Sequence, residues 1–276
     1  PSQAPVEAAV RHSQGSRAGK PELQVTLSGA GAGPASAPAV KAALERLLGL
    51  NVDLSSFYRL ADGDVALAPL ARRFRGLKPP RFPSLFEALV NAIACQQVTL
   101  TLGITLLNRL TQAYGRACRD PAAGERGGTA PAGFPEPEDL AGLPPEALRP
   151  LGFSRQKAQY LVDLAGAIAG GQLDLAALAA LDDEEAVASL RRLRGIGRWS
   201  AEYVLLRGLG RLDVFPGDDV GAANNLQRWL GLPGKLDYEG VHTVTAPWTP
   251  YRGLVYFHLL LDSLENRGVV RSASRP

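Results

Sequence analysis

Apolar residues recur at three- and four-residue spacing through most of the chain after residue 39, and this spacing limits the folds open to it. The pattern is clearest in residues 40–50, 85–95 and 102–114. Residues three and four apart share one face of a helix, so each segment predicts a helix with one buried side. The composition agrees, because 46% of the 276 residues are apolar and can fill a full-sized core. We therefore expect a mainly α-helical, globular body.

Boundary signals divide this body into further elements. Ser84 and Glu87 have the spacing of a capping box directly before an apolar run, which predicts the start of a helix. Residues 115–137 are rich in glycine and proline and predict a long loop. Additional helices are expected near residues 138–148, 154–169, 173–180, 183–193, 199–209 and 252–264, with one more after Gly217.

The N-terminal part of the chain has a different composition. Residues 1–20 and 28–39 are rich in alanine, glycine, serine and proline, which is typical of flexible segments. Between them, residues 22–27 alternate between polar and apolar side chains and predict a strand. We expect residues 1–39 to be flexible in large part.

Several functional classes are excluded by composition. The chain has two cysteines and three histidines, too few for a disulfide scaffold, a four-cysteine zinc site or a four-cysteine iron–sulfur cluster. It has no run of about 18 uncharged apolar residues, which excludes a membrane-spanning helix. Residues 1–20 lack the apolar core of a secretion signal. The expected location is cytoplasmic, associated with the nucleoid of a bacterium.

Residues 183–209 carry the pattern that points to a ligand. A predicted helix ends at Leu193, Gly195 and Gly197 follow, and a second helix begins near Arg198. Two glycines one residue apart permit a sharp turn that exposes backbone N–H groups at a helix start, where the helix dipole favours a phosphate. Residues 191–211 contain six arginines and one acid. This indicates a nucleic-acid backbone as partner, although an ordinary turn with a solvated basic face has the same local pattern.

The longer segment LRGIGRWSAEYVLLRGLGRLDVFPGDD, residues 193–219, resembles the helix-hairpin-helix DNA glycosylases. In that superfamily the hairpin is followed by a Gly/Pro-rich loop and one aspartate. Asp219 stands twenty residues after Trp199, as the family pattern requires. Within the superfamily, the alkylation-repair branch of the DNA-3-methyladenine glycosylase II type is also resembled by residues 79–100, 151–165 and 251–261.

The resemblance implies a domain organisation. Residues 1–78 would form a reduced N-terminal α/β domain, and residues 79–276 a two-lobed helical domain with the hairpin at 193–198. The expected fold is therefore mainly α with a small α/β N-terminal domain.

The resemblance assigns the chemistry to Asp219. Cleavage of an N-glycosidic bond builds positive charge on the sugar, and a fixed carboxylate stabilises that charge and can orient or deprotonate the attacking water. Asp218 is the rival carboxylate, which we interpret as a helix N-cap or a loop residue. Members that also cut the DNA backbone have a lysine where this chain has Trp199, so no lysine-dependent lyase step is expected.

The base pocket of the resembled family includes the positions of Trp199 and Tyr203, which lie one helical turn apart on one face. Their rings would attract a cationic alkylated base, whereas plain core packing is the alternative. Leu260 stands where the best-known enzyme of this branch has a second pocket tryptophan, which implies a less aromatic pocket. Gln97 is the candidate to fill the gap left by a flipped base; the alternative is a solvent-facing or capping glutamine.

Further contacts follow from the resemblance. DNA contacts are expected from the hairpin residues Arg194, Gly195, Ile196, Gly197 and Arg198. The carbonyl groups of Leu193 and Ile196 are expected to hold a monovalent cation, Na⁺ or K⁺, that bridges to phosphate. No organic cofactor is expected.

The sequence thus predicts a monomeric, monofunctional DNA glycosylase that removes alkylated, 3-methyladenine-like bases from double-stranded DNA in base excision repair. One alternative is a non-enzymatic helix-hairpin-helix protein that binds damaged or bent DNA. Another is a glycosylase for oxidised or deaminated bases.

Overall fold

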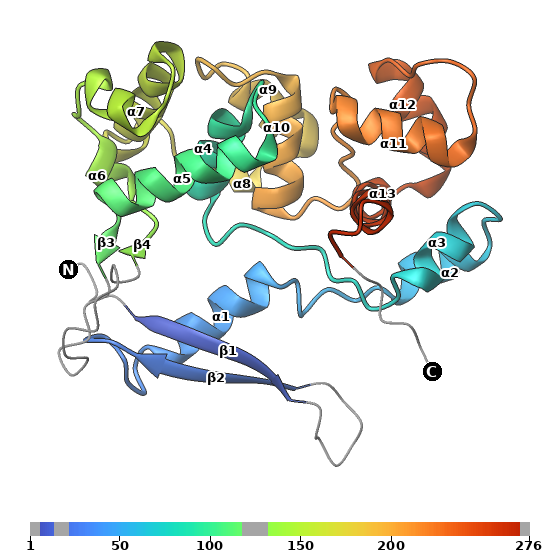
Figure 1. Ribbon diagram of the computed structural model, residues 1–276, viewed down its shortest axis with the longest axis horizontal. Coiled ribbons are helices and arrows are strands. Elements are labelled where there is room, and N and C mark those ends of the chain that lie inside the picture. Colours follow the sequence, from blue (N-terminus) through green and yellow to red (C-terminus); the bar gives the residue numbers. More distant parts are fainter. Residues whose placement is uncertain (1–5, 14–21, 118–131, 271–276) are drawn as a thin grey trace. The chain divides into compact units, whose positions relative to one another are not determined.

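The computed structural model describes residues 6–13, 22–117 and 132–270 (Figure 1). The chain divides into two compact units, and each unit combines two separate stretches of sequence. The first unit contains residues 1–45 and 97–170, and the second contains residues 46–96 and 171–276. The domain boundary expected between residues 78 and 79 coincides with none of these breaks and stays a prediction.

The first unit begins with a two-stranded antiparallel sheet. Strand β1 (Glu7–Ser13) pairs with β2 (Glu22–Ser28) (Figure 1). In this pairing Val10 lies opposite Val25. Strand β2 confirms the strand predicted at 22–27. The expectation of a flexible segment is wrong over residues 7–13, because pairing with β2 outweighs the weak strand propensity of two successive alanines. Helix α1 (Ala37–Leu47) follows the sheet.

Four helical segments and two short strands form the rest of the first unit. Helix α5 (Leu100–Tyr114) is followed by two short antiparallel strands, β3 (Arg116–Ala117) and β4 (Ala132–Gly133). In place of the single helix predicted at 138–148 are helix α6 (Pro137–Leu140) and a 3₁₀ helix, η1 (Pro145–Leu151). Pro144 and Pro145 lack the N–H groups that a continuous α-helix would need there. Helix α7 (Arg155–Ala169) is capped by Ser154, whose hydroxyl accepts the backbone N–H of Lys157.

The second unit has its core between its N-terminal and C-terminal helices. Helix α13 (Arg252–Asn266) packs against both α11 (Val220–Leu230) and α3 (Leu67–Arg73) (Figure 1). Helix α2 (Ser55–Asp62), helix α12 (Tyr238–Thr245) and a 3₁₀ turn, η3 (Ala246–Trp248), complete this layer. The interior is filled by large side chains that include Phe57, Leu67, Phe215, Leu226 and Leu254.

A second layer of this unit carries the predicted hairpin. It consists of α4 (Leu85–Cys95), α8 (Leu175–Ala180), α9 (Asp183–Leu190) and α10 (Arg198–Val204), which continues into one π-helical turn, η2 (Leu205–Leu209). The Ser84 hydroxyl accepts the N–H of Glu87 at 3.0 Å, which confirms the predicted start of α4. A Cβ at Gly208 would lie 2.8 Å from Cδ1 of Leu85, so the absence of a side chain lets η2 pack against α4. Among the helices described, none is long and apolar enough to cross a membrane.

Candidate active site

The predicted hairpin joins α9 to α10. Helix α9 ends at Leu190, and Gly195 then has φ of +88°, a left-handed conformation that a side chain would strain. Ile196 is 5% exposed, so its side chain anchors the turn in the core and only its backbone can meet a partner. Gly197 is the N-cap of α10 and is exposed. The first N–H groups of a helix have no partner within it, so this turn offers donors to an anion.

A glutamine braces this hairpin from α4. Nε2 of Gln96 donates to the carbonyl oxygen of Gly195 at 2.7 Å and to the Ser200 hydroxyl at 2.9 Å. Gln97, the residue predicted to fill the gap left by a flipped base, is exposed and has φ of +53°. Its role stays a prediction. Sequence reasoning did not single out Gln96, because two adjacent glutamines give no signal for which one faces the protein.

The six arginines around the hairpin have different surroundings. Arg191, Arg192 and Arg194 are exposed. Arg207 packs against aromatic rings, with Cζ 5.1 Å from the centre of the Phe82 ring. Arg211 donates to the carbonyl groups of Ala179 and Leu181 and pairs with Asp183, while Arg198 pairs with Asp218. At least three of the arginines that predicted a nucleic-acid partner therefore also make contacts within the protein.

The two aromatic residues of α10 stack on each other. The ring centres of Trp199 and Tyr203 lie 5.3 Å apart with an angle of 22° between the planes. The Tyr203 hydroxyl donates to Oδ1 of Asn91 on α4 at 3.1 Å, and burial raises the pKa of this phenol. These contacts fix both rings on one face of α10, as the spacing of four residues predicts.

Asp219 begins α11 and has both carboxylate oxygens engaged. Oδ1 accepts the N–H of Ala222 at 2.9 Å, which makes Asp219, and not Asp218, the N-cap of this helix. Oδ2 accepts the indole N–H of Trp199 at 3.2 Å and the hydroxyl of Tyr256 at 3.1 Å. Of our two interpretations of Asp218, the N-cap is therefore wrong and the loop residue is right. Three donors from three elements hold the Asp219 carboxylate in one orientation.

A pocket of about 260 Å³ opens beside this carboxylate. Leu260 contributes to its wall, as expected of a base-pocket residue, although the base-binding role itself stays a prediction. The pocket is lined by Asp219, Gly221, Ala222, Asn225, Tyr256, Leu260, Ser263 and Arg267. Apart from Asp219, its polar residues were not predicted, because they meet only when α11 and α13 are folded together. They are Asn225 of α11, Tyr256 and Ser263 of α13, and Arg267 at the end of α13.

A buried carboxylate supports the turn that precedes Asp219. Glu202 of α10 is 5% exposed, and it accepts the N–H of Gly217 at 3.1 Å and the hydroxyl of Tyr238 at 2.6 Å. Burial raises the pKa of Glu202, and burial with the hydrogen bond to Glu202 raises that of Tyr238. A Cβ at Gly217 would lie 2.7 Å from Cδ2 of the Tyr238 ring, so only glycine fits this turn without movement.

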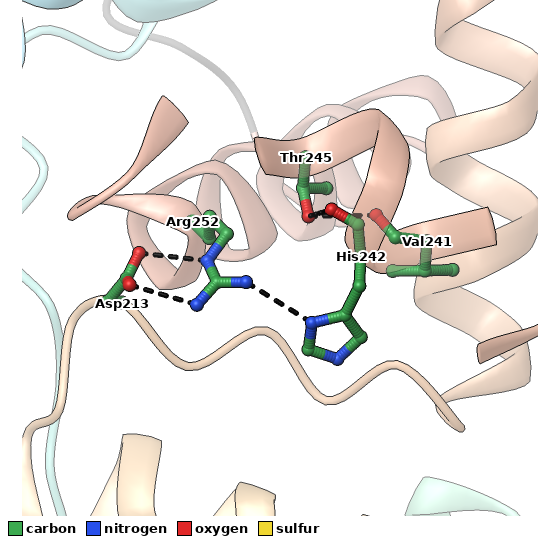
Figure 2. A network of polar contacts seen from close by, with 5 residues as sticks. All are labelled: Asp213, Val241, His242, Thr245 and Arg252. Carbon is green, nitrogen blue, oxygen red and sulfur yellow. Dashed lines mark hydrogen bonds and ion pairs between the residues drawn. The ribbon is translucent and has the colours of Figure 1, made fainter. Parts of the chain in front are cut away.

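The loop between η2 and α11 is also tied at its beginning. Figure 2 shows Arg252 of α13 between Asp213 of this loop and His242 of α12. The guanidinium donates to both Asp213 oxygens at 2.9 Å, and its Nη1 lies 3.2 Å from Nδ1 of His242. Burial lowers the pKa of His242, and the Arg252 charge lowers it further. The loop that carries Asp219 is therefore held at both ends.

Residues 90–250 match the family model of the HhH-GPD superfamily base excision DNA repair proteins. The chain belongs to the HhH-GPD superfamily. It is 31% identical over 210 residues to a DNA-3-methyladenine glycosylase of Bacillus subtilis, a match that covers 76% of this chain and 67% of the relative. It is 32% identical over 239 residues to DNA-3-methyladenine glycosylase 2 of Escherichia coli, which covers 86% of this chain and 76% of that protein.

Solved structures of this superfamily agree with the fold. A 3-methyladenine DNA-glycosylase from Archaeoglobus fulgidus superposes with a TM-score of 0.77 at 27% identity, and the match covers 94% of this chain and 84% of that one. This confirms the predicted mainly helical fold. For the first curated relatives, the chain spans 67%, 58% and 40% of the relative's own length. The hairpin of residues 193–198 lies inside the matched family region.

Proposed function

We propose that this chain is a DNA glycosylase that hydrolyses the N-glycosidic bond of alkylated, 3-methyladenine-like bases in double-stranded DNA. The observation that carries the proposal is the Asp219 carboxylate, held by Trp199, Tyr256 and the start of α11 beside a pocket. The proposal is also supported by the Bacillus subtilis and Escherichia coli relatives, which are named DNA-3-methyladenine glycosylases. A glycosylase from Schizosaccharomyces pombe with the same fold was solved with abasic DNA.

The proposed mechanism is electrostatic. As the base departs, the sugar gains positive charge, and the oriented carboxylate of Asp219 stabilises that charge and orients the attacking water. An alkylated purine is already a good leaving group, so the mechanism needs little acid catalysis. The target base must leave the stack first, which costs a few kcal/mol and is least for a damaged pair. Leu260 would offer the base a non-aromatic wall, whereas Trp199 and Tyr203 are not among the residues that line this pocket, and their contact with the base stays a prediction.

We also propose that the enzyme is monofunctional and monomeric. A lyase step requires an amine that attacks the sugar, and the indole of Trp199 cannot form a Schiff base. None of the residues that line the described pocket is a lysine. A Na⁺ or K⁺ ion at the hairpin remains part of the proposal. The Leu193 carbonyl already accepts the N–H of Ile196 at 3.1 Å, which leaves one of its lone pairs for an ion.

The test is base release from methylated duplex DNA by the wild type and by Asp219→Asn. We expect release of methylated purines that falls by orders of magnitude in the variant, and strand breaks only after alkali treatment. No release by either protein, with tight DNA binding by both, would show a binding protein instead of an enzyme. Release that survives the substitution would move the catalytic role to Asp218. Preferential release of oxidised or deaminated bases would change the substrate class.

A further inference from the structure

Arg198, the first residue of α10, makes an intramolecular ion pair at the protein surface, where its side chain is 38% exposed. Its Nε lies 2.7 Å from Oδ2 of Asp218 and its Nη2 lies 3.0 Å from Oδ1, a bidentate ion pair. One face of its guanidinium is covered by the Tyr238 ring, with Cζ 3.5 Å from the ring centre. The paired geometry uses two of the five N–H donors and the aromatic ring uses a planar face. A phosphate that took this guanidinium would have to compete with both contacts.

The partner of this arginine is the residue directly before Asp219. Arg198 binds Asp218, Trp199 binds Asp219, and Glu202 binds the N–H of Gly217. Three side chains within the first turns of α10 thus hold three consecutive residues of the turn that ends in Asp219. Each contact alone is modest, but together they fix the backbone path into α11 and the direction of its first carboxylate.

We propose that Arg198 is a positioning residue that fixes the Asp218–Asp219 turn through its bidentate ion pair, and not a DNA phosphate contact. This inference rests on the proposed function of Asp219. It replaces the expectation from sequence that Arg198 belongs to the phosphate-binding set of the hairpin. That role would remain with the exposed Arg194 and with backbone N–H groups of the hairpin.

The two roles have different signatures. A phosphate contact contributes to the affinity for DNA. Its loss reduces the slope of log K against the logarithm of the salt concentration by about one. A positioning residue contributes to the rate once DNA is bound, because small displacements of a catalytic group cost up to about a hundredfold. Lysine can replace arginine at a phosphate as a point charge, but it cannot make a bidentate pair.

The experiment compares Arg198→Gln, Arg198→Lys and Arg194→Gln with the wild type. Dissociation constants are measured on an undamaged duplex at several salt concentrations, and single-turnover base release on a methylated duplex at saturating enzyme. For both Arg198 variants we expect release to slow by about tenfold to a hundredfold, with unchanged affinity and salt dependence. For Arg194→Gln we expect weaker binding and a smaller salt dependence. A normal saturated rate in Arg198→Gln with a smaller salt dependence would overturn the proposal.

A double-mutant cycle tests the partner. If Arg198 acts through Asp218, the Arg198→Gln/Asp218→Asn double variant releases bases no more slowly than the slower single variant. Rate losses that multiply would show that the two side chains act independently and would contradict the inference.

A measurement that does not depend on base release tests this inference separately from the proposed function. If the wild type released no base, the function would fail, while amide hydrogen exchange would still test the positioning role. We expect Arg198→Gln to accelerate exchange at Gly217 and Ala222, whose N–H groups bind Glu202 and Asp219. Exchange in α13 serves as the control and should be unchanged. Equal protection of Gly217 and Ala222 in both proteins would contradict the inference.

Discussion

The hydroxyl of Tyr256 lies 3.1 Å from Oδ2 of Asp219, the oxygen that also receives the indole N–H of Trp199. Tyr256 projects from α13, where it is 8% exposed. Burial raises the pKa of its phenol well above the usual value, and the charge of Asp219 raises it further. The phenol is therefore protonated at neutral pH and can donate to the carboxylate.

Tyr256→Phe should slow base release without unfolding the protein. The substitution removes one donor to the carboxylate and keeps the ring that packs against Phe215. We expect a loss of about tenfold in the single-turnover rate, which corresponds to roughly 1.4 kcal/mol in the barrier. The matched control is Tyr114→Phe, which loses a hydroxyl contact to the Ala147 carbonyl in the first unit. Equal rates in Tyr256→Phe and wild type would show that the hydroxyl does not help to position Asp219.

Gln97 offers a second prediction, because it is the one non-glycine residue with positive φ in the described part of the chain. Glycine at this position should relieve backbone strain that alanine keeps. We therefore expect Gln97→Gly to be more stable than Gln97→Ala by about 1 kcal/mol, measured by urea denaturation.

Measurements of base release distinguish the role of the Gln97 side chain from that of its backbone conformation. If the side chain fills the gap left by a flipped base, both variants lose activity equally on a fully paired duplex. The loss should be smaller where the methylated base is mismatched, since less pairing energy opposes flipping. Wild-type release by Gln97→Ala would remove Gln97 from the mechanism.

Much of the fold could be predicted from sequence because its helices are long and their caps are local. The periodicity and Ser84 predicted α4, and Ser154 predicted the start of α7. Three short helices were not predicted individually: α2, α3 and α12 have eight, seven and eight residues, although the equally short α8 and α9 were predicted. Such helices depend on tertiary packing more than on propensity. Strand β1 was missed for the same reason, since its partner is what makes it a strand.

The residues of the site also fall into those that could be predicted from sequence and those that could not. Asp219 and Trp199 could be found because their motif is continuous in sequence. Tyr256 and Glu202 could not be found from sequence. An aromatic residue in an apolar helix predicts a core position, and a lone glutamate predicts a surface position. Their roles arise only when α13 and α10 are folded beside the turn that ends in Asp219.

Glu202 should make stability depend on pH. Because burial raises its pKa, the folded protein binds this proton more tightly than the unfolded chain. The group's contribution is therefore full below the usual glutamate pKa of about 4.3 and is lost as pH rises through the raised value. Relative to Glu202→Gln, the wild type should lose free energy of unfolding across this interval and then level off. Urea denaturation at a series of pH values measures this difference.

The control for Glu202 is Glu185→Gln on α9, whose side chain is exposed. Its stability, measured at the same pH values, serves as the reference for removing a surface carboxylate. A constant difference between Glu202→Gln and wild type would mean that the carboxylate titrates alike in folded and unfolded chains.

The contact between Arg252 and His242 in Figure 2 predicts a titration. Nη1 of Arg252 donates to Nδ1, so the imidazole is neutral with its proton on Nε2. Burial lowers the pKa of His242, and the Arg252 charge adds to the effect. The stability from this group is present above the usual histidine pKa of about 6.5 and is lost as pH falls through the lowered value.

Arg252→Gln removes the cation and leaves the negative charge of Asp213, so His242 should titrate at a higher pH in that variant. NMR of the imidazole carbon-bound protons, assigned with His242→Gln, measures both values. His258 is the internal reference, because its low pKa comes from burial and should not follow the substitution. An unchanged or lower pKa of His242 in Arg252→Gln would show that the guanidinium does not control this histidine.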